Sequence, residues 1–214
     1  MKCLCRGLIA VAICFVGLGQ PAAAGPLDDL LVPWSISSPY FAVGVSTVHH
    51  TGYFANGANA MKWVPGAKAY IGTQFTPAFS GEITYFHFGE SPIRFSSLHE
   101  KSDAATISLL AHYRFSKHSA WHAAIFGRQI ASILDRASLF AKGGAAYKWI
   151  RQESPGAGVI SENGATFHIG FGMELNLPNG FFLRGEYDYV GKIDTDTVIN
   201  VQHTPISVSI GKRL

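Results

Sequence analysis

The 214-residue sequence has few charged residues, and it has no cysteine after residue 24. Its three cysteines, Cys3, Cys5 and Cys14, all lie in the first 24 residues, so the remaining chain has neither disulfides nor thiolate metal ligands. Charged residues make up only 14% of the chain, and without Lys2 and Arg6 there are 15 basic residues against 14 acidic ones. This balance excludes a basic surface for nucleic acid, so no nucleic-acid partner is expected.

Long apolar runs are also missing after residue 24, which excludes membrane-spanning helices in that part of the chain. The run from Gly7 to Gly19 has about 13 residues, whereas a spanning helix requires roughly 20. Lys2 and Arg6 precede this run and small residues ending at Ala24 follow it, an order typical of a secretory signal peptide. A membrane anchor is the weaker alternative, and the sequence predicts export.

Lipidation at Cys14 is a second alternative for this segment. Lipoprotein processing favours a small residue before the cysteine, whereas Ile13 is bulky. Cleavage after Ala24 is therefore favoured. We expect a signal peptide at 1–24, an N-terminal lead-in at 25–38 and one barrel domain at 39–214.

Segments of about ten residues that alternate apolar and polar side chains take the place of long apolar runs. Residues 165–176 put Phe167, Ile169 and Phe171 on one face and Glu174 on the other. Because a strand has a period of two, this pattern predicts a lipid-facing surface and a lumen-facing surface. The expected strands are 40–49, 67–75, 81–90, 105–115, 138–149, 165–176, 181–190 and 205–214.

Membrane-spanning strands must close on themselves, because lipid offers no partner for an unpaired backbone group. The predicted fold is therefore all-β, a closed antiparallel up-and-down transmembrane β-barrel of about eight strands. Within this set, 81–90 is the weakest strand, since Phe86 and Phe88 share a face with Glu82 and Thr84.

The middle of the chain leaves the number of strands open at eight or nine. Residues 120–130 alternate poorly, and omitting them gives an even number of strands at the cost of a long connection at 116–137. The short connections would then be 76–80 and 177–180. The long loops, expected at the cell exterior, would be 50–66, 91–104, 150–164 and 191–204.

Two stretches carry a resemblance to a known family. Residues 135–147 (DRASLFAKGGAAY) and 182–190 (FLRGEYDYV) resemble the small OmpA-like outer-membrane β-barrel family, which includes opacity-type surface proteins. The resemblance implies an outer-membrane location and a role in membrane integrity, adhesion or host contact. It also implies as partners outer-membrane lipid and lipopolysaccharide, the barrel assembly machinery, and a possible host or surface ligand at the loops.

The chain departs from this family in two respects. It stops with the last expected strand, so no peptidoglycan-binding domain is expected. Its final residue is Leu214 rather than an aromatic, and Lys212 and Arg213 precede it.

Catalytic residues are not expected. The enzymatic alternative is a lipid A deacylase-like outer-membrane hydrolase, which uses a His-x-Ser pair and a carboxylate. The nearest approaches are His118-Ser119 and His49-His50-Thr51, and neither has that spacing. A soluble exported lipocalin-like carrier is a further alternative, and it would place apolar residues inside the barrel.

No metal site or cofactor is expected either. His49, His50, His99 and His203 could meet at the outer rim, but polar rim and lumen residues are the simpler interpretation. The pair Asp194 and Asp196 is too weak a signal for a calcium site. Charged residues on the inward faces predict instead a lumen closed by ion pairs. These are Lys68, Glu82, Arg114, Lys142, Lys148, Glu174, Arg184, Glu186 and Asp188.

Overall fold

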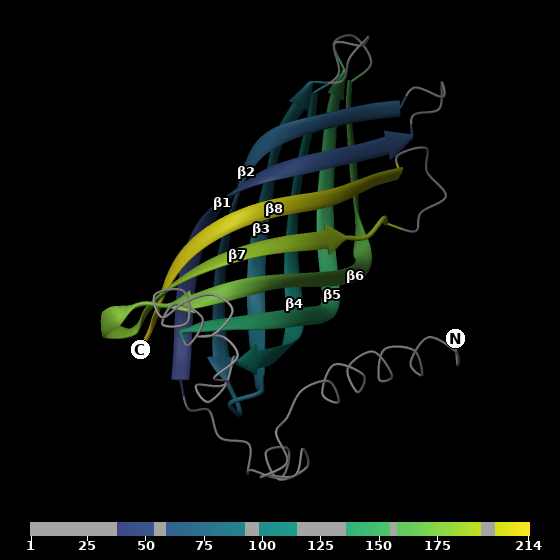
Figure 1. Cartoon of the computed structure of the whole chain (residues 1–214). Coiled ribbons are helices and arrows are strands. Elements are labelled where there is room, and N and C mark those ends of the chain that lie inside the picture. Colours follow the sequence, from purple (N-terminus) through teal and green to yellow (C-terminus); the bar gives the residue numbers. More distant parts are fainter. Residues whose placement is uncertain (1–37, 54–58, 93–98, 115–135, 155–157, 194–199) are drawn as a thin grey trace, which may run out of the picture.

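Eight antiparallel strands follow one another around a closed barrel in a computed structural model of the chain (Figure 1). The structure describes residues 38–53, 59–92, 99–114, 136–154, 158–193 and 200–214. No helix in these residues is long and apolar enough to cross a membrane. The strands are β1 (Ser38–Tyr53), β2 (Asn59–Gln74), β3 (Phe79–Pro92), β4 (His99–Arg114), β5 (Ala137–Ser154), β6 (Gly158–Asn176), β7 (Phe181–Val190) and β8 (Asn200–Arg213).

The barrel closes where β8 pairs with β1. Their register runs from Tyr40 opposite Arg213 to Tyr53 opposite Asn200, and the backbone N–H of Leu214 donates to the carbonyl of Pro39 at 2.9 Å. Figure 1 shows the two strands side by side, strongly tilted like their neighbours. This pairing leaves no free sheet edge, as a membrane-spanning sheet requires. The predicted fold class is confirmed, and eight strands suffice for closure.

The outer surface is apolar and the interior is polar. Val45, Ile107 and Phe171 are 71%, 63% and 61% exposed on the outside, whereas Lys148 and Asp188 inside are fully buried. A soluble carrier would have the opposite arrangement, so the lipocalin-like alternative is wrong. The outward faces predicted for residues 165–176 and 181–190 agree with the structure.

Aromatic side chains mark one limit of this apolar band. Tyr85 on β3 and Tyr147 on β5 both lie opposite Ala105 of β4, so the two tyrosines occupy matching outward positions on either side of β4. Trp149 packs edge-on against Tyr147, with ring centroids 5.0 Å apart. Aromatic rings favour the membrane–water interface, so this row places one interface near these residues.

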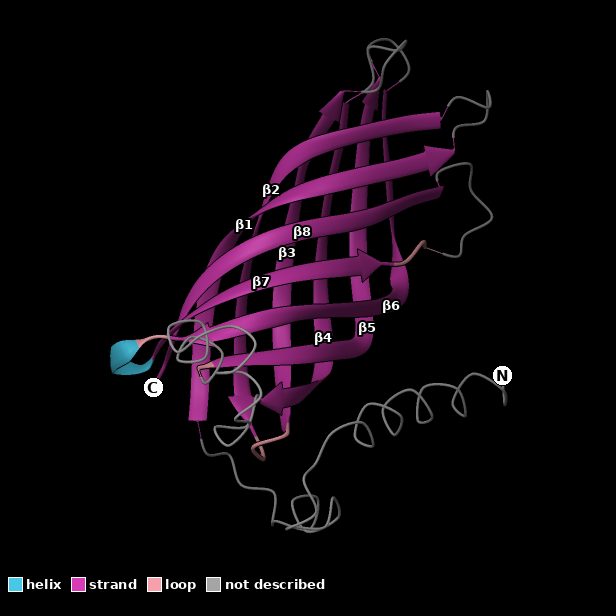
Figure 2. Ribbon diagram, in the orientation of Figure 1, coloured by secondary structure: helices cyan, strands magenta, loops and turns pink. Residues whose placement is uncertain are grey.

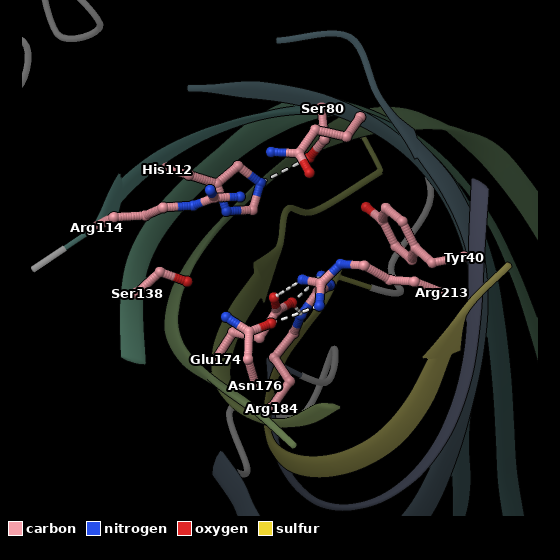
Figure 3. A pocket seen from close by; sticks show the side chains of 10 residues that line it. Tyr40, Ser80, His112, Arg114, Ser138, Glu174, Asn176, Arg184 and Arg213 are labelled. Atoms are coloured by element: carbon pink, nitrogen blue, oxygen red, sulfur yellow. Dashed lines mark hydrogen bonds and ion pairs between the residues drawn. The ribbon is translucent and has the colours of Figure 1, made fainter. Parts of the chain in front are cut away.

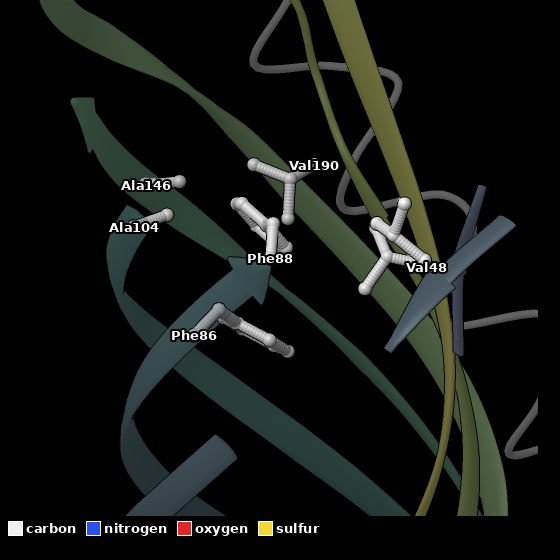
Figure 4. Packing of buried hydrophobic residues seen from close by; sticks show 7 residues of the cluster. Val48, Phe86, Phe88, Ala104, Ala146 and Val190 are labelled. Atoms are coloured by element: carbon white, nitrogen blue, oxygen red, sulfur yellow. The ribbon is translucent and has the colours of Figure 1, made fainter. Parts of the chain in front are cut away.

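The mixed face of β3 has a structural reason. Glu82, Thr84, Phe86 and Phe88 all point inward and are buried, while Tyr85 between them faces outward. Phe86 and Phe88 pack with Val48, Val64, Ala104, Ala146 and Val190 into an apolar layer inside the lumen (Figure 4). The weakest predicted strand is therefore a full barrel strand whose apolar end fills the interior.

The loops are much shorter than predicted, because the strands continue into all four regions expected to be long loops. The connections between strands are 54–58, 93–98, 155–157 and 191–199, in place of 50–66, 91–104, 150–164 and 191–204. The alternation of apolar and polar residues fades there because polar side chains occupy both faces, such as the buried Glu100 and the exposed Lys101, although backbone pairing continues. Trp63, assigned to a loop, lies on β2 with an exposed side chain beside His49.

The opposite end of the barrel holds two short connections, as predicted, and the long connection between β4 and β5 at 115–136. Residues 75–78 join β2 to β3, where the hydroxyl of Thr76 accepts from the backbone N–H of Phe79 at 3.0 Å. The 3-10 turn η1 (Pro178–Gly180) joins β6 to β7, and its Asn179 and Gly180 adopt positive φ (Figure 2). The signal-peptide prediction at 1–24 and the strand question at 120–130 lie outside the described residues.

Candidate functional site: the charged lumen

A network of buried ion pairs fills the lumen below the apolar layer, and Arg184 lies at its centre. Glu174 of β6 and Arg184 of β7 are opposite each other in the register. The guanidinium donates to Glu174 Oε2 from Nε at 3.0 Å and from Nη2 at 2.8 Å, and from Nη1 to Glu82 Oε2 at 2.5 Å. Arg184 therefore connects β7 to β6 and, across the interior, to β3.

Two lysines extend the network on the side of the apolar layer. Lys142 Nζ lies 2.9 Å from Asp188 Oδ1, 3.2 Å from Glu186 Oε1 and 3.6 Å from Glu82 Oε1. Lys68 pairs with Asp188 at 3.4 Å and also contacts Glu186. These side chains are fully buried, and each charge faces an opposite charge, which the low-polarity interior requires.

His168 contacts this network through both of its ring nitrogens. One ring nitrogen, Nδ1, is 2.8 Å from the Ser108 hydroxyl, and the other, Nε2, is 3.1 Å from Asp188 Oδ1. The hydroxyl of Tyr40 donates to Glu82 Oε2 at 3.3 Å. Hydrogen bonds from side chains other than lysine and arginine therefore supplement the ion pairs around the carboxylates.

Aromatic rings surround the Arg184 guanidinium. Its Cζ lies 4.7 Å from the ring centroid of Tyr70, 4.9 Å from that of Phe140 and 5.2 Å from that of Phe182. A guanidinium near aromatic faces gains cation–π attraction, most of all when it is desolvated. The rings also occupy the space around the ion pairs, so the lumen is filled by side chains at this level.

A recess opens from the η1 end of the barrel onto this network (Figure 3). Arg213 of β8 reaches into it and contacts both Glu174 and Asn176. On the opposite wall, the Ser80 hydroxyl lies 2.7 Å from His112 Nε2. Arg184 lines the recess with them, so the recess meets the ion pairs.

The predicted set of lumen charges needs two corrections. Arg114 is exposed at the rim of the recess rather than buried among acids. Lys148 is buried, but its Nζ donates to the Val201 carbonyl at 2.5 Å, on the other side of the apolar layer. Arg213 takes part instead, so four cations face four anions. Its position could have been read from the inward row of alternate residues that contains Ser209 and Gly211.

Hydroxyl and imidazole groups meet once in the recess, at the Ser80–His112 pair that sequence reasoning missed. A hydrolytic triad also needs a carboxylate that orients the histidine. In the part of the chain that the structure describes, no carboxylate is hydrogen-bonded to His112. The hydrolase candidate pair His118 and Ser119 lies outside the described residues.

The structure brings together part of the histidine set considered for the outer rim. His50 and His203 face each other inside the barrel beside Glu100, whereas the ring of His49 packs against the exposed Trp63. Asp194, Asp196 and the side chain of His99 lie outside the described residues. Sequence reasoning missed Glu100, because it lies in a segment assigned to a loop.

Solved structures with the same fold include two of the attachment invasion locus protein Ail of Yersinia pestis. The first is 14% identical to this chain with a TM-score of 0.54, and the alignment covers 84% of this chain and 100% of Ail. The second, a complex with the heparin analogue sucrose octasulfate, is also 14% identical, with a TM-score of 0.53 and coverage of 83% of this chain and 98% of Ail. Neisserial surface protein A is 13% identical with a TM-score of 0.47, covering 81% of this chain and 97% of the other. A search of curated proteins finds no match.

Comparison of the sequence with models of protein families identifies the family of this chain. The profile of the OmpA-like transmembrane domain matches residues 40–213, which include nearly all of the barrel from β1 to β8. The match agrees with the closed eight-stranded topology, the apolar outer band and the polar interior. The chain belongs to the OmpA-like transmembrane β-barrel domain family and is a protein of the bacterial outer membrane.

Proposed function

We propose that the protein is a structural and surface-interaction component of the outer membrane, with a lumen closed to ions and no enzymatic activity. The observation that supports this proposal is the ion-pair network across the lumen, which balances four cations against four anions and is buried except for Arg213 at its edge. Lys142 alone lies within 3.6 Å of three carboxylates. An eight-stranded barrel has room in its interior for side chains and little else, so a general porin function is disfavoured.

Conductance tests the closed lumen directly. Purified protein in a planar bilayer should show rare or very small openings. The double variant Lys142→Ala/Glu82→Ala removes one cation and one anion from the middle of the network, so its openings should be more frequent or larger. Steady, large, ohmic channels in the wild type would contradict the proposal and indicate a porin.

We propose that the connections at 54–58, 93–98, 155–157 and 191–199 face the cell exterior, and that the η1 end faces the periplasm. Short periplasmic turns are usual in outer-membrane barrels, and η1 is such a turn. We also keep residues 1–24 as the signal peptide and 25–38 as the lead-in, and expect the mature protein to begin after Ala24.

Single-cysteine labelling tests this orientation, because the expected mature chain has no cysteine of its own. Lys101 and Pro77 are both exposed, and they lie at opposite ends of the barrel. On intact cells a membrane-impermeant maleimide should label Lys101→Cys and leave Pro77→Cys unlabelled until the membrane is permeabilised. The reverse labelling pattern would show that the barrel has the opposite orientation in the membrane.

The proposed partners are outer-membrane lipid and lipopolysaccharide around the apolar band, the barrel assembly machinery, and a surface ligand at the exterior connections. Ail, which has the same fold, was solved with a heparin analogue. Binding of cells that express this protein to immobilised sulfated polysaccharide tests the last of these. Binding equal to that of cells without the protein would exclude this ligand class.

A further inference from the structure

Three side chains of metal-ligand type meet inside the barrel on the far side of the apolar layer. They are His50 of β1, Glu100 of β4 and His203 of β8, and their ligand atoms all lie within 4.8 Å of one another. Glu100 Oε1 is 3.8 Å from His50 Nδ1 and 3.7 Å from His203 Nε2. Each residue is at most 3% exposed, so the cluster is part of the interior.

Neighbouring groups orient two of these side chains toward a common centre. The ring of His50 donates from Nε2 to the carbonyl of Phe88 at 3.1 Å, and a carbonyl can only accept. The lone pair of neutral His50 is therefore on Nδ1, the atom nearest Glu100. The hydroxyl of Ser102 donates to Glu100 Oε1 at 2.8 Å. Metal-binding histidines and carboxylates are usually supported by such outer contacts.

The third side chain, His203, is held by ring packing. Its ring stacks on Phe88, with centroids 4.3 Å apart and planes 10° apart, and meets the edge of the His50 ring at 4.5 Å. His50 and His203 are also direct partners in the pairing of β1 with β8. The backbone register therefore fixes the two imidazoles next to each other.

The ring nitrogens of this cluster lack the hydrogen bonds that a purely structural role would provide. Among the described residues, His50 Nδ1 and both nitrogens of His203 have no hydrogen-bond partner. His168 is equally buried, yet both of its nitrogens are hydrogen-bonded. A buried polar group without a partner lowers the stability of the fold by about 1–3 kcal/mol. A ligand bound to these nitrogens would remove part of that cost.

We propose that His50 Nδ1, Glu100 Oε1 and His203 Nε2 bind one divalent transition-metal ion, with Zn²⁺ as the representative cation. Two imidazoles and one carboxylate are a recurrent zinc set that leaves a further position for water. Bonds of about 2.0–2.1 Å at a tetrahedral angle put neighbouring ligand atoms about 3.3 Å apart, so modest side-chain rotation closes the site. The imidazoles favour transition metals over Mg²⁺ and Ca²⁺, which prefer oxygen ligands alone.

The nearby charges are compatible with a bound dication. Lys148 interacts electrostatically with Glu100 and His203, and also with the buried Glu162. One lysine and two carboxylates leave a net negative charge, which a divalent ion reverses to a single positive one. Lys148 therefore weakens the site without excluding the ion.

The apolar layer separates this site from the ion pairs of the lumen. Phe88 contributes to both, since its ring belongs to the layer and its carbonyl supports His50 (Figure 4). An ion that entered from the end of the barrel opposite η1 would pass a second buried apolar cluster, Ile150, Ile193 and Val201, without crossing the closed lumen. The site departs from the sequence-based expectation of no metal, and it is independent of whether the barrel conducts ions.

Zinc titration of the full-length barrel without a polyhistidine tag, by isothermal calorimetry in detergent micelles, tests the proposal. We expect one Zn²⁺ per chain, and visible absorption bands of a nitrogen- and oxygen-ligated ion when Co²⁺ is used as the probe. Glu100→Gln and His203→Phe should each weaken binding by at least about tenfold, the lower limit for losing even a supporting contact. The first variant keeps the volume of the side chain, and the second keeps the stack on Phe88.

His49→Ala is the matched control, because His49 is adjacent to His50 but packs against the exposed Trp63. Its zinc affinity should equal that of the wild type. Heat-modifiable migration on gels establishes that each variant is folded before titration. A folded wild type that binds no Zn²⁺ would overturn the proposal. Unchanged affinity in both Glu100→Gln and His203→Phe, or full competition by Mg²⁺, would do so as well.

Discussion

Replacing Arg184 alone should destabilise the barrel more than replacing Arg184 and Glu82 together. Arg184 is 1% exposed and holds two carboxylates, Glu174 and Glu82. Arg184→Met leaves three cations against four anions in the network. Adding Glu82→Gln restores a balance of three to three, because Glu174 keeps Arg213 and Lys142 keeps Glu186 and Asp188.

The magnitude follows from the burial of these charges. A pair of unit charges about 4 Å apart interacts by about 4 kcal/mol at the effective dielectric constant that reproduces measurements on proteins. Removing one partner of a buried pair typically costs about 3–5 kcal/mol, because it leaves a charge unpaired. We therefore expect Arg184→Met to lower the free energy of unfolding by about 3–5 kcal/mol, and the double variant to lower it by at least about 1 kcal/mol less.

Urea unfolding in lipid vesicles, followed by tryptophan fluorescence and by heat-modifiable migration, measures both values. Arg114→Met is the control, because Arg114 is exposed at the rim, where a substitution should change stability by less than about 0.5 kcal/mol. Equal costs for Arg184→Met and Arg114→Met would refute the reasoning. A double variant as unstable as the sum of its single variants would also refute it, since the two charges would then act independently.

Two further substitutions test the lipid-facing and lumen-facing surfaces. Phe171→Arg, in the middle of the outer apolar band, should lower the free energy of unfolding by about 2–4 kcal/mol. Leu177→Arg, in the same outward row but next to η1, should lower it by at most about 1 kcal/mol. Equal losses for the two variants in lipid vesicles would place Phe171 outside the membrane. Gly172→Ala should cost about 1–3 kcal/mol through overpacking, because its Cβ would lie 2.3 Å from the Gly185 carbonyl oxygen and 2.7 Å from the Phe140 ring. Gly185→Ala is the control, since nothing lies within 4 Å of its Cβ, and equal melting temperatures for the two variants would contradict this packing.

The strand faces could be predicted from the sequence because the pattern is local. The outward row of Phe167, Ile169 and Phe171 is visible from spacing alone, because every second side chain of a strand faces the lipid and the ones between face the polar lumen. The strand ends could not be predicted, because there the same backbone pairing continues with polar side chains on both faces, such as the buried Glu100 and the exposed Lys101. The crowding at Gly172 was also invisible, since parity alone suggests a position on the lumen face that tolerates a small residue.

The sequence by itself determined the class of fold and most of the charges that point inward, because each depends on spacing along one strand. It left the number of strands at eight or nine, and the closed pairing of eight strands decided between them. Only the tertiary structure decided which charges pair. Arg184 contacts Glu82 across 102 positions of the chain, and Arg213 replaces Arg114 in the network. The same holds for His50, Glu100 and His203, which come from three strands. Barrel closure and stagger bring such residues together, and no local pattern encodes the distance across the lumen.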